Sequence, residues 1–66
     1  MTPSEIKELK KFGYSVFEVT GWTNGKYCFD LNNEELNVYH SSYDVKMTKE
    51  LCWQAAADWH NKHFAH

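Results

Sequence analysis

The chain contains no arginine, so all seven of its Lys and Arg positions are lysine. Arginine is the side chain that grips phosphates and guanine edges with two parallel hydrogen bonds, and its absence argues against a protein that reads nucleic acid. Nine acidic residues bring the formal net charge to −2 at pH 7. This balance points the same way, because nucleic-acid binding draws much of its affinity from positive charge.

Long apolar runs are absent as well, since the sequence has no stretch of about 18 apolar residues and no charged leader followed by an apolar segment. We therefore expect no membrane span, no secretion and a cytoplasmic location. The two cysteines, Cys28 and Cys52, do not form a Cys-x-x-Cys pair. Without a secretory leader they are expected to be free thiols rather than part of a disulfide framework.

What the chain does contain is typical of one folded domain over residues 1–66, with 42% hydrophobic and 17% aromatic residues and no repeat or linker. Its start fits a capping box, in which Thr2 caps a helix and Glu5 reaches back to it. Gly13 lies where a left-handed residue would end that helix. We therefore predict a helix over Pro3–Phe12.

Residues 47–66 predict a second helix with an unusually wide apolar surface. At about 100° per residue, its apolar and aromatic side chains cover an arc of about 240°, which is wider than an ordinary amphipathic stripe. The surplus indicates either a helix wrapped by the rest of the domain or a surface that awaits a partner. One such partner is a second copy of the chain, bound through Trp53, Ala57 and Phe64.

The segment between the two helices predicts three strands. An Asn-Gly hairpin signal lies within a three-residue loop over Thr23–Gly25, with Gly25 left-handed in a bulge. This loop pairs Phe17 with Leu31 and Val19 with Phe29, so that the bulky residues of both strands share one face.

A second loop over residues 32–35 extends the same face, because it places Leu36 beside Leu31 and Val38 beside Phe29. Both helices need this one apolar face to cover them. The predicted fold class is α+β, a two-layer α-β-β-β-α arrangement in which a three-stranded antiparallel meander carries both helices on one face. The same register turns Cys28 to the opposite face.

The run Thr48–Ala57 resembles the start of the last helix in double-stranded RNA-binding domains, which share this element order. The family has a Ser-Lys-Lys-x-Ala-Lys run there, and Lys49 matches one of its lysines, whereas Glu50 and Trp53 stand at two others. Thr23-Asn24-Gly25-Lys26 replaces the family's Gly-Pro-x-His signature. The resemblance implies the architecture, and it makes a nucleic-acid-binding domain the alternative function.

The predicted register also gathers acidic and aromatic side chains on the face turned away from the helices. Glu18 would lie directly opposite Asp30, an arrangement of like charges that costs stability. Three interpretations stay open: a solvated acidic edge that opposes aggregation, a docking patch for a basic partner surface, or a bound cation. The patch comprises Glu18, Trp22, Asp30, Glu34, Glu35 and Tyr39.

We therefore expect a non-catalytic protein-binding module, a small inhibitor or adaptor whose partner has a basic surface, with no cofactor. The lack of arginine beside five asparagines and seven lysines makes the chain similar in style to small accessory proteins of bacteriophages. That resemblance implies action on a host protein.

Two other chemistries are weaker in the sequence. A metal site would draw on His60, His63, His66 and Cys52, but this spacing does not bring four ligands together. A hydrolase would draw on the run His40-Ser41-Ser42-Tyr43-Asp44, yet consecutive strand residues point to opposite faces. We expect neither a bound metal nor catalysis.

Overall fold

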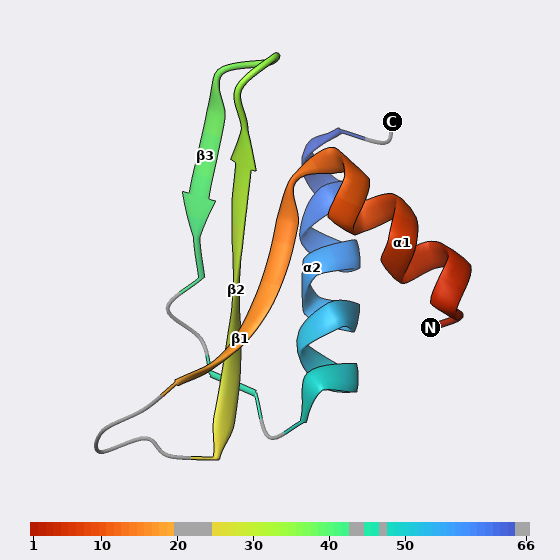
Figure 1. Cartoon of the computed structure of the whole chain (residues 1–66), viewed down its shortest axis with the longest axis vertical. Coiled ribbons are helices and arrows are strands. Elements are labelled where there is room, and N and C mark those ends of the chain that lie inside the picture. The colour runs from red at the N-terminus through yellow and green to blue at the C-terminus, as the bar shows by residue number, and fades with distance from the viewer. Residues whose placement is uncertain (20–24, 43–44, 47, 65–66) are drawn as a thin grey trace.

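Two helices flank a three-stranded antiparallel sheet in a computed structural model that describes residues 1–19, 25–42, 45–46 and 48–64. The two helices lie on the same side of the sheet, and α1 leans on α2 (Figure 1). The predicted fold class is confirmed. In chain order the elements are α1 (Pro3–Phe12), β1 (Tyr14–Val19), β2 (Lys26–Asn33), β3 (Val38–Ser41) and α2 (Lys49–His63).

Helix α1 has the predicted bounds and the predicted capping box. The Thr2 hydroxyl accepts a hydrogen bond from the Glu5 amide at 3.2 Å, and the Glu5 carboxylate accepts one from the Thr2 amide at 3.3 Å. Gly13 ends the helix with φ +131°, and its amide donates to the carbonyls of Leu9 and Lys10 at 3.1 Å. The chain turns directly from this glycine into β1.

Helix α2 begins after Thr48, whose hydroxyl accepts a hydrogen bond from the Leu51 amide at 3.1 Å. Most of its wide apolar surface is covered within the domain, because the sheet covers one part of it and α1 another, whereas Leu51 stays 52% exposed. Trp53 is only 7% exposed, and Ala57 and Phe64 pack against the core. Neither helix in the described ranges is long and apolar enough to cross a membrane.

The predicted register between β1 and β2 is wrong. Val16 pairs with Phe29, and Phe17 pairs with Cys28, so Phe17 and Phe29 lie on opposite faces of the sheet. Because the side-chain period of a strand is two residues, a shift of three positions moves every β1 side chain to the other face. The expected loop falls largely on residues 20–24, which lie outside the described part of the chain.

The core explains this difference. The β1 segment carries two pairs of apolar residues that point to opposite faces of the strand. Tyr14 and Val16 point to one face, and Phe17 and Val19 point to the other. The helices can cover only one of these faces. The chain buries Tyr14 to 2% exposure, and Gly13 holds the alignment because its carbonyl accepts a hydrogen bond from the Asn32 amide at 3.0 Å. Packing at the α1 end of the strand therefore overrides the turn preference at the other end.

The predicted pairing of β2 with β3 aligns the wrong residues, but it places the β3 side chains on the correct faces of the sheet. Asn33 pairs with Val38 across a turn over residues 34–37, and Asn37 adopts the left-handed conformation with φ +56°. Leu36 therefore lies at the tip of the turn, 55% exposed, instead of beside Leu31. A shift of four positions preserves parity, so Val38 still faces the helices.

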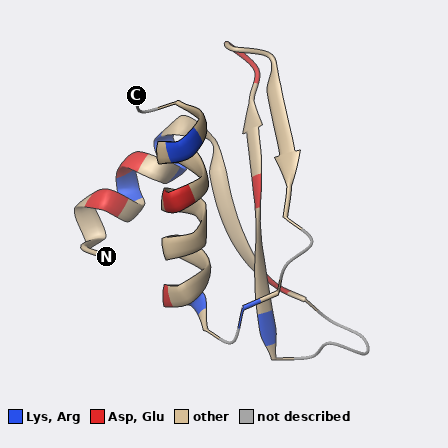
Figure 2. Cartoon of the chain, turned by 180° about the vertical axis from the view of Figure 1, so that it is seen from behind, with Lys and Arg blue, Asp and Glu red and all other residues tan. Residues whose placement is uncertain are grey.

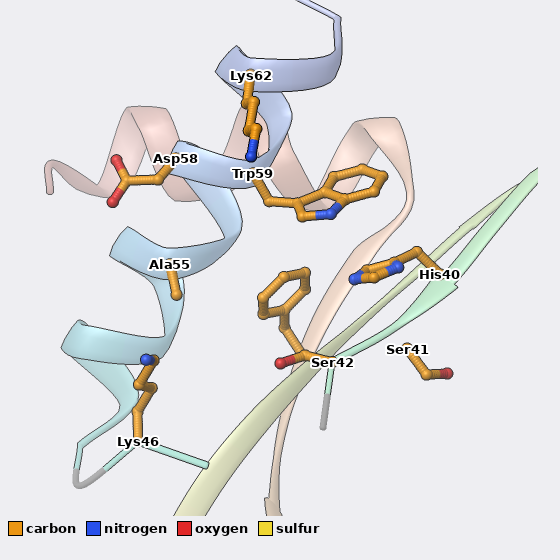
Figure 3. Close-up of a pocket in the computed structure, with 9 residues that line it drawn as sticks. His40, Ser41, Ser42, Lys46, Ala55, Asp58, Trp59 and Lys62 are labelled. Carbon is orange, nitrogen blue, oxygen red and sulfur yellow. The ribbon is translucent and has the colours of Figure 1, made fainter. Parts of the chain in front are cut away.

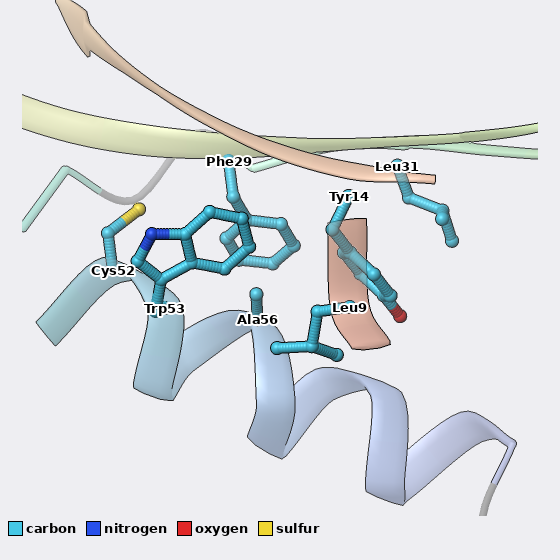
Figure 4. Close-up of a cluster of buried hydrophobic side chains, with 7 residues drawn as sticks. All are labelled: Leu9, Tyr14, Phe29, Leu31, Cys52, Trp53 and Ala56. Atoms are coloured by element: carbon cyan, nitrogen blue, oxygen red, sulfur yellow. The ribbon is translucent and has the colours of Figure 1, made fainter. Parts of the chain in front are cut away.

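The core lies between the sheet and the helices, and its buried members come from every layer (Figure 4). Cys52 and Leu31 have the largest fully buried side chains. Cys28 lies on the opposite face, as predicted, and both cysteines are free thiols. The core consists of Leu9, Tyr14, Phe29, Leu31, Cys52, Trp53 and Ala56.

Candidate functional site

The sheet face turned away from the helices is the first candidate surface, here called the open face. In the described part of the chain, no helix covers this face (Figure 1). Its aromatic side chains are Phe17, which is 43% exposed, and Tyr39, which is 61% exposed. The open face comprises Ser15, Phe17, Val19, Lys26, Cys28, Asp30, Asn32, Tyr39 and Ser41.

The structure brings some of the predicted patch residues together and separates others. Asp30 pairs with Ser41, and Tyr39 is two residues from Ser41, so Asp30 and Tyr39 are diagonal neighbours on the open face. Glu34 and Glu35 lie in the turn beyond them, and acidic positions occur both along β2 and near this turn (Figure 2).

Glu18 does not belong to the open face, which corrects the predicted acidic pair. It pairs with Tyr27 and points to the side of the sheet that carries the helices, whereas the β1 partner of Asp30 is Ser15. The expected repulsion between two facing carboxylates is therefore absent. Trp22 lies outside the described residues.

A second candidate surface is a groove between β3 and α2, here called the β3–α2 groove, with a volume of about 580 Å³ (Figure 3). It exists because α2 packs over β1 and β2 and leaves β3 extending beyond it. The lining residues are Phe29, His40, Ser41, Ser42, Lys46, Ala55, Asp58, Trp59 and Lys62.

Trp59 forms one wall of this groove and contacts two histidine rings. The His40 ring stacks on it with centroids 4.4 Å apart and planes 18° apart, and the His63 ring lies 4.2 Å away at 35°. Phe29 packs against His40 at 5.9 Å. These contacts fix the position of the indole relative to β3.

The charged groups of the groove are arranged unevenly. Lys62 and Lys46 lie at its two ends, whereas the Asp58 carboxylate points away from His40 and Trp59 (Figure 3). Asp58 accepts a hydrogen bond from the Gln54 side chain at 3.1 Å, one turn back along α2. The groove therefore has a cationic character.

A third histidine is tied to the core. The Tyr14 hydroxyl and Nδ1 of His60 share a hydrogen bond of 3.0 Å, and the His60 ring also packs edge-on against Phe12 at 4.6 Å. Burial raises the pKa of Tyr14 from 10.0 to about 12. The hydroxyl therefore stays protonated, and this contact is structural.

The thiols and the histidines are the side chains that a metal site or a nucleophilic enzyme would use. Burial raises the pKa of both Cys52 and Cys28, which makes them poor nucleophiles at neutral pH. Within the described ranges, no three His, Cys, Asp or Glu side chains gather as a metal site would require. His66, which is considered as a ligand in the metal hypothesis, falls outside those ranges.

The run considered for a hydrolase is divided between the two faces of the sheet. His40 faces α2 and Ser41 lies on the open face, while Ser42 lines the groove with His40. Tyr43 and Asp44 lie outside the described residues.

The chain matches no known family model, no curated protein sequence and no solved structure. The two surfaces therefore carry the functional argument. Strand alternation predicts from the sequence that His40 lies on the helix side of the sheet. The stacking of His40 on Trp59 cannot be predicted in this way, because the core sets the rotation of α2 about its own axis. The positions of Lys46 and Lys62 in the groove cannot be predicted from the sequence either.

Proposed function

We propose that this chain is a non-catalytic protein-binding module, a small inhibitor or adaptor of cytoplasmic location that docks through its open face. The observation that carries the proposal is the exposure of Phe17 and Tyr39 on a sheet face that no described helix covers. Aromatic side chains are enriched at the centres of protein interfaces, where they bury large areas at low entropic cost.

The charge of this surface indicates the partner. Asp30 lies diagonally opposite Tyr39, and Glu34 and Glu35 continue the acidic character into the turn, whereas Lys26 lies at the other end of β2. Such a surface complements a basic one, and complementary charge raises the association rate and excludes acidic competitors. A host protein with a basic surface fits this chemistry, in keeping with the resemblance in style to bacteriophage accessory proteins.

Affinity capture from cell lysate tests the proposal with a pair of matched charge reversals. Asp30→Lys changes the open face, and Glu18→Lys makes the same change on the opposite face. We expect the native chain and the Glu18→Lys variant to recover the same protein, and Asp30→Lys combined with Tyr39→Ala to lose it. Direct binding of the purified partner is then measured by calorimetry.

Equal recovery by all three chains would show that the open face is not the docking surface. A titration against duplex RNA at increasing salt tests the alternative function. Tight binding that weakens steeply with salt would favour the nucleic-acid-binding domain instead. The lysines available for it include Lys49, which lies 5.9 Å from the Tyr27 ring, and Lys10, which lies 5.7 Å from that of Trp53.

A further inference from the structure

The β3–α2 groove adjoins the outer edge of β3, which no strand of the described chain covers, since the sheet order is β1-β2-β3. An edge strand presents backbone amides and carbonyls that can pair with another chain. The groove therefore combines a hydrogen-bonding backbone with a side-chain surface on α2.

The hydrogen-bond pattern shows which backbone groups face outward. The Ser42 amide donates to the Phe29 carbonyl at 2.9 Å, so residues 42 and 29 form a hydrogen-bonded pair. Such pairs alternate along an antiparallel ladder, which places His40 with Leu31 in the next one. The amides and carbonyls of Tyr39 and Ser41 consequently point away from β2, toward the free edge.

The aromatic wall of the groove argues against a flat ligand stacked on it. His40 and His63 already occupy positions against the Trp59 ring, at 4.4 Å and 4.2 Å between centroids. A planar small molecule would have to displace one of them. An extended peptide requires no such displacement, because it bonds to the backbone of β3 and only its side chains reach α2.

The lysines determine the charge of that peptide. Among the described residues, neither Lys46 nor Lys62 forms an ion pair with a carboxylate. The carboxylate of Asp58 is directed elsewhere and bonded to Gln54. Acidic side chains spaced four residues apart in a strand lie about 13 Å apart on one face, at about 3.3 Å per residue, and can approach both ends of the groove.

We propose that the β3–α2 groove binds an extended acidic segment of a partner protein, which adds to β3 as a further strand and sets its carboxylates against Lys46 and Lys62. This site shares β3 with the open face but uses other groups, namely the outward backbone amides and carbonyls of Tyr39 and Ser41 and the flank of α2. It does not depend on the function proposed for the open face.

Nuclear magnetic resonance titration of the ¹⁵N-labelled chain tests the proposal, because it detects weak binding and locates it. The probe is a capped peptide, Ser-Glu-Ser-Val-Ser-Glu-Ser, compared with the same peptide carrying lysine in place of glutamate. We expect the acidic peptide to shift the backbone amides of Tyr39 and Ser41 and the indole signal of Trp59. The lysine peptide should leave them unchanged.

Two sets of variants identify the contacts. Lys46→Glu with Lys62→Glu should weaken binding by at least about tenfold, whereas the matched control, Lys7→Glu with Lys11→Glu on the exposed side of α1, should leave it unchanged. Ser41→Pro removes an outward-facing amide and should abolish binding. If Ser41→Pro fails to fold, the lysine variants still decide the question.

The proposal is wrong if the acidic peptide shifts no signals, shifts those of Ser15, Phe17 and Asp30 or of α1 in place of the Tyr39 and Ser41 amides, or binds no better than the lysine peptide. It is also wrong if both lysine pairs weaken binding equally. The variant Asp30→Lys with Tyr39→Ala should still bind the peptide, because the Tyr39 backbone remains. Failure of one site can thus be told from failure of the other.

Discussion

At the scale of single residues, Gly13 controls how α1 joins the sheet. Its φ of +131° is a conformation that other residues rarely adopt, and a Cβ at this position would lie 2.4 Å from the Asn32 carbonyl oxygen. That oxygen belongs to the backbone of β2, so it cannot move aside as the end of a side chain can. The same glycine accepts the hydrogen bond that aligns the two strands.

We expect Gly13→Ala to lower the free energy of unfolding by at least about 2 kcal/mol, because strained backbone and steric overlap add together. Gly25→Ala is the matched control, since Gly25 has φ +83° but no atom within 4 Å of a Cβ. It should cost only the left-handed conformation, about 1 kcal/mol. Urea unfolding measures both, and equal losses would show that the contact with Asn32 is unimportant.

At the scale of elements, the helices were the predictable part of the fold. Capping residues are local signals, and those of Thr2 and Gly13 gave the bounds of α1 correctly. The breadth of the apolar surface on α2 can also be predicted from the sequence, but the cause of this breadth cannot. It reflects burial between the sheet and α1, which depends on contacts distant in sequence.

The strand register was the unpredictable part, for a physical reason. Tyr14 and Phe17 point to opposite faces of β1, and the Asn-Gly turn signal favours the register in which Phe17 faces the helices. The core selected the other register, because α1 ends at Gly13 and delivers Tyr14 directly beneath the helices. The same choice removed Glu18 from the predicted acidic patch and left Asp30 and Tyr39 on the open face.

Helix α2 offers a test of local capping within this framework. Thr48→Ala removes the hydroxyl that accepts from the Leu51 amide, and we expect a loss of about 1 kcal/mol in the free energy of unfolding. Thr48→Ser keeps the acceptor and should remain within a few tenths of a kcal/mol of the native chain. Chemical denaturation followed by Trp fluorescence compares the three proteins. Identical midpoints for alanine and threonine would show that the cap does not contribute.

At the scale of the whole molecule, the fold distributes its aromatic residues between the core and the open face. One connected set fills the space at the end of the sheet, where Tyr14 and Phe12 meet His60 and Phe64. Another pair, Phe17 and Tyr39, remains on the open face. A small chain buries a limited fraction of its surface, and aromatic groups left exposed by its core are available to a partner.

The stability of the whole domain should depend on the protonation of Tyr14 in alkaline solution. Burial raises the pKa of Tyr14 from 10.0 to about 12 in the folded chain. Above pH 10 the unfolded chain releases this proton while the folded chain keeps it, so rising pH favours unfolding. The contribution of Tyr14 is therefore complete below about pH 10 and is lost between pH 10 and about 12.

Tyr14→Phe isolates this effect from the other groups that titrate in the same range. At neutral pH the variant should be less stable by about 1 kcal/mol, because it lacks the hydrogen bond to His60. As the pH rises through 10, the native chain should lose stability faster than the variant, so the difference between them should shrink. Urea unfolding at intervals of pH measures both curves. Two curves that stay parallel from neutral pH into this range would contradict the burial of Tyr14. They would mean that the Tyr14 hydroxyl is as accessible to water in the folded chain as in the unfolded one.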